Sequence, residues 1–257
     1  MRVAFLGPEG TYTHMAADRY FEDYEEVPCS SNREAVETDA EAAVIPFENS
    51  LGGGVGESVD LLRQKDVSVT GEVRLEVNHV LASNDRMEDV EAVVSHPQAL
   101  SQCSNFLRER SFETRESSST ARAAKEIEDG EAAICSRKAA EVNNLDIIEE
   151  NLQDEGNNTT RFLVLNGESR ERDKTSLILD PGVDRPGLLE SILSCFSGHG
   201  INLAYIQSRP TKDGLGNYYF YVEAETGRES PDFRKARKCL ETYADVKTLG
   251  SYEVSES

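Results

Sequence analysis

Short apolar runs alternate with segments of helical spacing from the N-terminus to about residue 165. Helical spacing is found at residues 12–20, 55–64, 98–110, 120–128 and 136–143. Runs typical of buried strands are residues 3–6, 42–46, 90–95 and 132–135, with further extended segments at 67–70 and 73–81. This alternation predicts an α/β domain whose strands pair largely in parallel.

A charged segment without apolar side chains, residues 167–174, follows and predicts a solvated linker. Beyond it the pattern predicts six elements in the order βαββαβ, with a turn at Asp213 and Gly214. Pro186 suits the first turn of the first helix, and Ser230 suits the N-cap of the second. This order is that of a ferredoxin-like domain. The elements are strands 175–180, 201–208, 217–225 and 246–252 and helices 187–197 and 231–243.

The formal net charge of −21, from 48 acidic and 27 basic residues, argues against a nucleic-acid partner, whose phosphates would be repelled. The acidic residues are dispersed and arginine outnumbers lysine, which favours a halophilic host. Molar salt shortens the Debye length to about 3 Å and screens such a surface. An ordinary acidic enzyme is the alternative.

No apolar run approaches the ~20 residues that span a bilayer, so we expect no membrane partner. The N-terminal apolar run is too short for a signal peptide, which favours a cytoplasmic location. The five cysteines form no CxxC pair, and we expect buried thiols rather than a disulfide framework or a zinc site. No residue set has metal-ligand spacing and no nucleotide fingerprint is present, so no metal or cofactor is expected.

Polar motifs follow several of the predicted strands. Gly7, Gly10 and Thr11 lie between the first strand and its helix, where backbone can approach an anion. Glu48 and Asn49 lie at the carboxyl end of the second strand, where ligand sites of open α/β sheets form. Both motifs have plain structural alternatives, a strand–helix turn in the first case and helix-capping groups in the second.

Three further motifs add candidate groups. Ser95 and Gln102 follow the third strand and could contact a ligand, with His96 a weaker candidate base. The hydroxyl-rich segment 117–121 could cap a helix or hold an anion. Arg161 is a natural bidentate partner for a carboxylate, although an arginine in such a place is more often on the surface. Taken alone, these residues indicate an anion-binding α/β domain with a small sensor-like domain.

In this order, the motifs GPEGTYTH, IPFENS, SHPQALSQC, SSTA and TTRF, which begin at residues 7, 45, 95, 118 and 159, resemble those of the prephenate dehydratase family. The segments DRPGLL from residue 184 and INLAYIQSRP from residue 201 resemble its ACT regulatory domain. The resemblance implies a catalytic domain, residues 1–168, of two lobes similar to periplasmic binding proteins. Lobe one would be 1–76 plus 156–168, lobe two 77–155, and the ACT domain 175–252.

The family's reaction converts prephenate into phenylpyruvate, carbon dioxide and water in L-phenylalanine biosynthesis. The resemblance implies Thr160 as the proton donor or hydrogen-bond partner of the leaving hydroxyl, a role open to a threonine only in a dry site. It implies catalytic roles for Thr160, Glu48, Asn49, Ser95 and Gln102. Substrate would contact Thr11, Ser50, Ser119, Thr120, Arg161 and Phe162, the last by packing. Phenylalanine, as effector, would contact Gly187, Leu188, Leu189, Asn202, Leu203, Gln207, Ser208, Arg209 and Pro210.

The sequence departs from the family pattern in two places. Ser118 stands where some members have a glutamate, with Glu116 two residues earlier, and Gln207 replaces the glutamate of the Glu-Ser-Arg-Pro motif. No chorismate mutase segment precedes the catalytic motifs, so we expect one activity. Because the family's ACT domains bind phenylalanine as pairs, a homodimer or homotetramer is expected. The alternatives are an arogenate dehydratase and a sensor without enzymatic activity.

Overall fold

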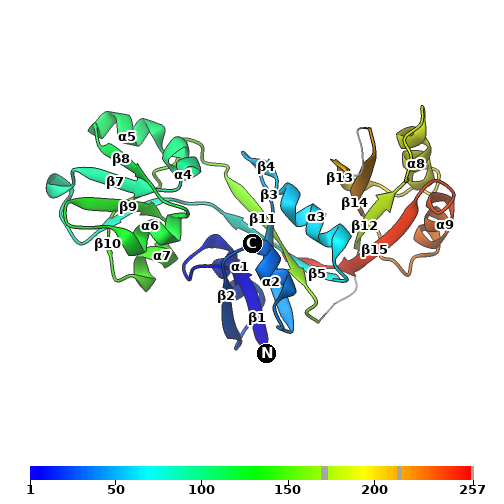
Figure 1. The fold of residues 1–257 in the computed structure, drawn as a ribbon, viewed down its shortest axis with the longest axis horizontal. Helices are drawn as coiled ribbons and strands as arrows, with labels where there is room; N and C mark the ends of the chain where they lie inside the picture. The colour runs from blue at the N-terminus through cyan, green and yellow to red at the C-terminus, as the bar shows by residue number, and fades with distance from the viewer. Residues whose placement is uncertain (169–172, 213–215, 256–257) are drawn as a thin grey trace.

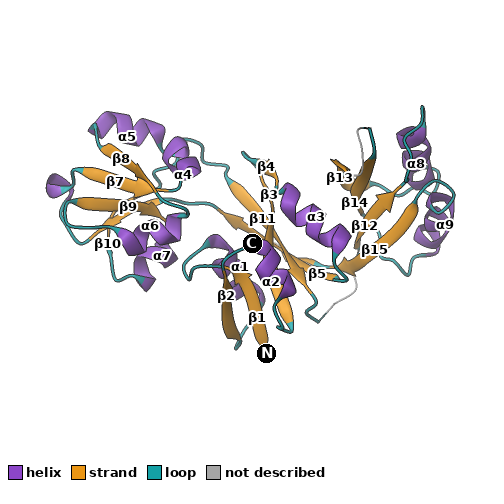
Figure 2. Cartoon of the chain, in the orientation of Figure 1, coloured by secondary structure: helices purple, strands orange, loops and turns teal. Residues whose placement is uncertain are grey.

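The computed structural model describes residues 1–168, 173–212 and 216–255. Three sheets follow one another along an elongated molecule, with lobe one between lobe two and the C-terminal domain (Figure 1). Figure 2 shows that helices accompany each sheet, as an α/β protein requires. None of the helices in the described residues has the length and apolarity needed to cross a membrane.

Lobe one is built on a sheet of strand order β16-β5-β11-β3-β1-β2, with β4 paired to β3. Strand β1 runs parallel to β2 and β3, whereas β11 runs antiparallel to β3 and β5. The strands are β1 (Arg2–Leu6), β2 (Glu25–Cys29), β3 (Ala42–Asn49), β4 (Gly53–Gly54), β5 (Val69–Glu76), β11 (Thr159–Leu165) and β16 (Val254–Ser255). The helices are α1 (Tyr12–Tyr20), α2 (Asn32–Glu37) and α3 (Gly56–Gln64).

Lobe two has a sheet of order β10-β6-β9-β7-β8, in which β7 is parallel to β8 and β9 while β6 is antiparallel to β9 and β10. Its strands are β6 (Val80–Ser83), β7 (Ala92–Ser95), β8 (Glu113–Glu116), β9 (Glu131–Cys135) and β10 (Asp146–Glu150). Its helices are the 3₁₀ turn η1 (Met87–Asp89), α4 (Pro97–Gln102), α5 (Ser104–Arg110), α6 (Thr120–Glu126) and α7 (Arg137–Val142).

The expectation of largely parallel pairing is therefore wrong. The chain leaves lobe one through β5 and returns to it through β11, which runs back between β5 and β3. Lobe two follows the end of β5, so the chain that returns from it enters the sheet at that same end and runs antiparallel to β5. The local apolar pattern does not contain this information.

The C-terminal domain is the predicted βαββαβ unit, with an antiparallel sheet of order β13-β14-β12-β15. The predicted linker begins at Gly167, but residues 169–172 and the turn at Asp213 and Gly214 lie outside the described residues. The domain limits stay predictions. The elements are β12 (Lys174–Asp180), α8 (Leu188–Ser197), β13 (Leu203–Pro210), β14 (Tyr218–Ala224), α9 (Pro231–Leu240) and β15 (Asp245–Tyr252). Ser230 occupies the N-cap position of α9, although its side chain makes no capping hydrogen bond.

A disulfide joins Cys195 of α8 to Cys239 of α9, with Cα atoms 5.6 Å apart. This corrects the expectation that the cysteines form no disulfide. The two residues are 44 positions apart in sequence and meet because α8 and α9 pack on one face of the same sheet. The free cysteines are buried as expected, and burial raises the pKa of the Cys103 and Cys135 thiols to about 12.

The other face of the C-terminal sheet packs on lobe one, and the two share one apolar core. Phe47 and Leu62 of lobe one lie in the same buried cluster as Ile178, Tyr221 and Leu249 of the C-terminal domain. Burying each such side chain contributes roughly 1.5–3 kcal/mol. The C-terminal domain is therefore part of the fold of lobe one and not a loosely tethered appendage.

Asp60 on α3 adds a polar contact between lobe one and the C-terminal domain. It accepts hydrogen bonds from Arg209 at 3.1 and 3.2 Å, from Lys212 at 2.8 Å and from the Tyr219 hydroxyl at 2.5 Å. Burial alone would raise the pKa of Asp60, but these hydrogen bonds outweigh it and lower the pKa to about 2. The carboxylate therefore stays ionised throughout the physiological pH range.

This contact should weaken in acid. Because unfolded aspartate has a pKa of ~3.9, the contact stabilises the fold above about pH 4, and this stabilisation is lost as the pH falls towards 2. Asp60→Asn should therefore flatten the dependence of the urea midpoint on pH in this range. Asp146→Asn, at an exposed position of lobe two, is the control and should leave the dependence unchanged. Equal slopes in the Asp60 variant and the parent would contradict this assignment.

Candidate active site

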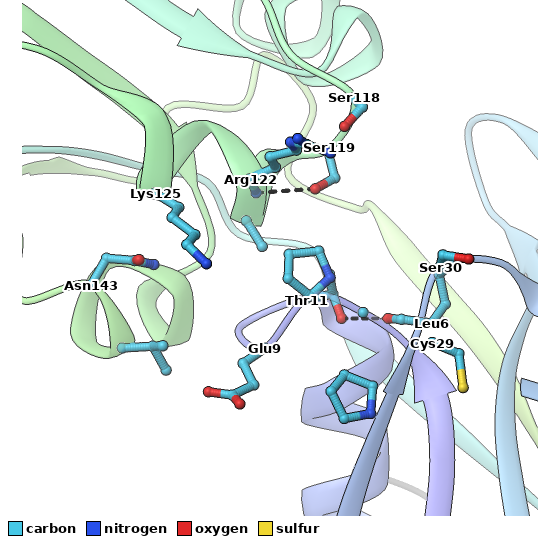
Figure 3. A pocket seen from close by; sticks show the side chains of 15 residues that line it. Leu6, Glu9, Thr11, Cys29, Ser30, Ser118, Ser119, Arg122, Lys125 and Asn143 are labelled. Atoms are coloured by element: carbon cyan, nitrogen blue, oxygen red, sulfur yellow. Dashed lines mark hydrogen bonds between the residues drawn. The ribbon is translucent and has the colours of Figure 1, made fainter.

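A cavity of about 640 Å³ lies between the two lobes. Lobe one contributes the loop between β1 and α1 and the end of β2, and lobe two contributes residues of α6 and the end of α7 (Figure 3). Its size suits a small organic ligand. The polar side chains that line it are Glu9, Thr11, Ser30, Ser118, Ser119, Arg122, Lys125 and Asn143.

The hydroxyls of Thr11 and Ser119 occupy the N-cap positions of α1 and α6 on opposite sides of this cavity. Thr11 accepts from the His14 backbone N–H at 3.2 Å, and Ser119 accepts from that of Arg122 at 3.0 Å. Both residues were predicted as substrate contacts from their motifs. A capping hydroxyl beside exposed helical N–H groups is an environment that favours negative charge.

Two cations from α6 add to this environment, because Arg122 and Lys125 lie three residues apart on one face of the helix. Arg122 is held by Glu126, with Nε 2.7 Å from the carboxylate. Lys125 extends into the cavity (Figure 3), and among the described residues no carboxylate lies within 4.0 Å of its Nζ. The cavity thus offers positive charge within a protein of net charge −21.

The loop carrying Thr11 is fixed to lobe two through Gly10. The Ser136 hydroxyl, at the start of α7, donates to the Gly10 carbonyl at 2.7 Å. Gly10 has φ +83°, and a Cβ placed there would lie 2.7 Å from the Cα of Ala139. Only glycine meets both demands, so the two lobes touch closely at this point.

The possible ligand atoms of His14, Asp18 and Glu26 lie within 4.8 Å of one another, close enough to hold a metal ion. However, Nδ1 of His14 accepts a hydrogen bond from the Gly10 N–H at 3.1 Å. In the neutral ring the proton then sits on Nε2, which faces Asp18 and Glu26 at 3.5 and 3.3 Å. In this tautomer Nε2 has no lone pair to offer a metal ion, and it makes no hydrogen bond to the described residues.

A second polar network, whose members are not among the residues that line this cavity, contains Thr160. The Asn49 amide Nδ2 donates to the Thr160 hydroxyl at 2.9 Å and to Asn158 Oδ1 at 2.7 Å. Gln102 Oε1, from lobe two, accepts from Asn158 Nδ2 at 3.2 Å and lies 3.1 Å from His79 Nε2. Three residues predicted from separate motifs, Asn49, Gln102 and Thr160, are therefore brought together.

His79 connects this network to the cavity loop. Its ring centroid lies 6.1 Å from that of Tyr12 in an edge-on contact, and the Tyr12 hydroxyl donates to the Asn78 carbonyl at 2.6 Å. Burial lowers the pKa of His79, against a smaller opposing effect of the bond to Gln102, which favours the neutral ring. His79 and Asn158 were not among the predicted site residues, although Asn158 directly precedes the TTRF motif.

Other predicted residues lie elsewhere. Arg161 and Glu48 point to the face of the sheet opposite Thr160 and Asn49, because successive strand residues alternate. There Arg161 Nη2 lies 3.1 Å from Glu48, and Arg161 Nη1 contacts Glu72 and Glu223 at 3.1 and 2.6 Å. The structure therefore does not place Arg161 in the cavity, and the carboxylates that it contacts belong to the protein.

Ser95 is fully buried and donates to the Ile134 carbonyl at 2.6 Å, and Phe162 packs in the core of lobe one. Neither is among the residues that line the cavity. The Ser50 hydroxyl accepts a hydrogen bond at 2.9 Å from the N–H of Thr159, the first residue of β11. Thr120 is the first residue of α6. Sequence reasoning missed Arg122 and Lys125, which helical spacing after Ser119 could have indicated.

The predicted effector residues divide into two groups. Gly187 is the N-cap of α8 with φ +80°, and Asn202 donates to Glu225 at 2.7 Å. Gln207 and Arg209, from alternate positions of β13, instead face the region of β4 and α3 in lobe one. Their role with an effector stays a prediction.

The family model for prephenate dehydratase matches residues 3–170, and the model for the ACT domain matches residues 182–238. The chain belongs to the prephenate dehydratase family. A prephenate dehydratase of Methanocaldococcus jannaschii is 34% identical over 98% of each chain. A bifunctional chorismate mutase/prephenate dehydratase of Aquifex aeolicus is 39% identical over 98% of this chain and 73% of its own length.

Solved structures agree with this assignment. The prephenate dehydratase of Staphylococcus aureus has a TM-score of 0.86 and 33% identity, covering 98% of this chain and 100% of that one. That of Arthrobacter aurescens, in complex with L-Phe, has a TM-score of 0.89 and 29% identity, covering 98% and 90%. A quorum-quenching acylase, GqqA, shares the fold at 25% identity and a TM-score of 0.91, covering 99% and 98%, so fold alone does not give the activity.

The contact at Gly10 can be tested by adding one methyl group. Gly10→Ala should destabilise the protein by about 2–4 kcal/mol, because it adds a steric clash with α7 to the strain of a positive φ. Gly53→Ala is the matched control, since Gly53 has φ +76° and nothing lies within 4 Å of its would-be Cβ. Equal losses of unfolding free energy in the two variants, measured in urea, would show that the lobes do not touch closely at Gly10.

Proposed function

We propose that this protein converts prephenate into phenylpyruvate, carbon dioxide and water, as a carbon–oxygen lyase of L-phenylalanine biosynthesis. The observation that carries the proposal is the cavity between the lobes, which combines capping hydroxyls with the Arg122 and Lys125 side chains in a chain that belongs to this family. Prephenate is a dianion, and a locally positive cavity counters its repulsion by the acidic surface.

The chemistry requires two groups to leave one ring. Loss of the ring carboxylate as carbon dioxide leaves the electron pair of the broken C–C bond in the ring, and the 4-hydroxyl departs as water, taking the electrons of its C–O bond and a supplied proton. Aromatisation makes the overall step favourable. The protein must hold the dianion, exclude water and donate a hydrogen bond to the leaving oxygen.

Thr160 is proposed as that donor. Its oxygen already accepts from Asn49 Nδ2 at 2.9 Å, which leaves the hydroxyl proton free to point towards a substrate oxygen. Asn49 is in turn oriented by Asn158 and by the backbone N–H groups of Leu51 and Gly52 at 3.1 and 2.8 Å. The amide thus fixes the direction of the hydroxyl without taking its proton. Glu48 and Arg161 form an ion pair on the opposite face of the same two strands, β3 and β11.

Regulation by L-phenylalanine through the ACT domain forms part of the proposal. The support is the ACT domain itself and the related structure that contains L-Phe. We further propose a cytoplasmic homodimer or homotetramer and a surface adapted to high salt. Gln207 carries no charge, so binding of the effector would depend less on salt than with a glutamate there.

Arogenate dehydration is a second candidate, favoured by relatives such as the arogenate dehydratase/prephenate dehydratase 2 of Arabidopsis thaliana, 37% identical over 99% of this chain and 73% of that one. Arogenate carries an amine in place of the side-chain ketone. Parallel assays on both substrates decide between them. Consumption of neither would favour a sensor without enzymatic activity.

The role of Thr160 is tested by two substitutions. Thr160→Ala should lower kcat for phenylpyruvate formation by roughly 10²–10⁴-fold with little change in KM, because it removes a hydrogen bond made to the leaving group. Thr160→Ser keeps the hydroxyl and should retain most of the activity. Phenylpyruvate is followed by its absorbance in alkali. A Thr160→Ala enzyme that works at the parental rate would remove this residue from the mechanism.

A further inference from the structure

The guanidinium of Arg161 is enclosed by groups from both domains. Its Cζ lies over the rings of Phe47 and Tyr205, 4.6 and 5.0 Å from their centroids, and these two rings contact each other with centroids 5.4 Å apart. Its Nη1 contacts Glu72 of β5 at 3.1 Å and Glu223 of β14 at 2.6 Å. Glu223 belongs to the C-terminal domain. Arg161, which follows Thr160 on β11, is therefore bound by a residue of that domain.

These contacts form a cluster of balanced charge in which Glu72 and Glu223 are fully buried. Lys174 Nζ lies 2.6 Å from Glu72 and 3.0 Å from Glu223, and Arg74 Nε lies 2.9 Å from Glu72. Burial alone would raise the pKa of Glu72, but the charges of Arg161 and Lys174 outweigh it and lower the pKa. Loss of one member therefore leaves a buried charge uncompensated and disturbs the others.

The cluster lies on the face of the lobe-one sheet opposite the Thr160 hydroxyl. Thr160 and Arg161 are consecutive residues of β11, so moving the backbone of one moves the other. The pairing of β11 with β3 also shifts register between Arg161 and Phe162, an irregularity that re-aims side chains near active sites. Asn49, which holds the Thr160 hydroxyl, is likewise next to Glu48, which pairs with Arg161.

The hydrogen bonding of Arg161 is incomplete. Its Nε and Nη2 atoms are buried and lack a hydrogen-bond partner among the described residues, and Nη2 has only the ion-pair contact with Glu48. Unsatisfied buried donors cost free energy and persist only where the surroundings impose them. The present position of the Arg161 side chain is therefore imposed by its carboxylate partners. A shift of Glu223 would allow this side chain to take a different position.

We propose that Arg161 is a positioning residue for Thr160 and that Glu223 makes this positioning depend on the C-terminal domain. Arg161 then contacts no substrate; it sets the place of the hydroxyl through the strand they share. A ligand that moves β14 acts on turnover by moving Glu223. The inference rests on the proposed function, since it assumes that Thr160 assists the leaving group.

The test uses the full-length chain and the variant Glu223→Gln. The substitution removes the carboxylate charge that binds Arg161. The amide oxygen of the new side chain can still accept the hydrogen bond from the Tyr221 hydroxyl, which lies 2.8 Å from Oε1 of Glu223. Glu72→Gln is the matched control, equally buried and bonded to the same Arg161 Nη1, but located in lobe one. Glu223→Asp, which retracts the carboxylate but keeps its charge, replaces Glu223→Gln if that variant does not fold by circular dichroism.

The first readout is the γ-methyl signal of Thr160 in protein labelled with ¹³C-threonine, assigned by its absence in Thr160→Ser. L-phenylalanine should shift this signal in the parent and in Glu72→Gln, but not in Glu223→Gln. The signal should also differ between the parent and Glu223→Gln without effector. This readout requires no turnover, so it stands even if prephenate is not the substrate.

The second readout is kinetic. Glu223→Gln should lower kcat by about 10- to 100-fold, as for a slightly misplaced group, with KM within about twofold of the parent. A Glu223→Gln enzyme with parental kcat and a parental Thr160 signal would overturn the inference. A parent inactive on both prephenate and arogenate would overturn the proposed function instead, and the methyl signal would then decide the coupling alone.

Discussion

The buried contact between Arg161 and Glu223 is the interaction on which the arrangement of the molecule depends. It joins the strand that returns from lobe two to the sheet of the C-terminal domain, across an interface that also contains a shared apolar core. Buried charges tolerate little displacement, because each must keep its partner. Strand β11 and the sheet of the C-terminal domain therefore have to adjust together, and this constraint is the basis of the coupling proposed between that domain and turnover.

At the cavity, too, electric charge is compensated by nearby side chains. Under the proposed function a protein of net charge −21 has to bind a dianion, and the cavity offers Arg122, Lys125 and two capping hydroxyls against the overall field. The loop that carries one of these hydroxyls is set by Gly10 against α7 of the other lobe. Binding and lobe contact are thus coupled through a single short segment.

The sequence predicted those features that depend on local patterns. The βαββαβ unit and helix α1 were predicted from spacing, Asn49 and Gln102 from their motifs, and Thr160 from the family resemblance, and the structure brings these three residues together. Strands β2, β8 and β10 were missed because they carry charged residues and little alternation. The antiparallel return of β11, the Cys195–Cys239 pair and the partners of Arg161 depend on contacts between distant segments, which no local pattern encodes.

The most direct test of this coupling is hydrogen–deuterium exchange of the backbone amides with and without L-phenylalanine. The account predicts that the effector changes protection in β14 and, together with it, in residues 159–165 of β11, because Glu223 and Arg161 connect them. A change confined to the C-terminal domain, with β11 unaltered while the effector is bound, would contradict it.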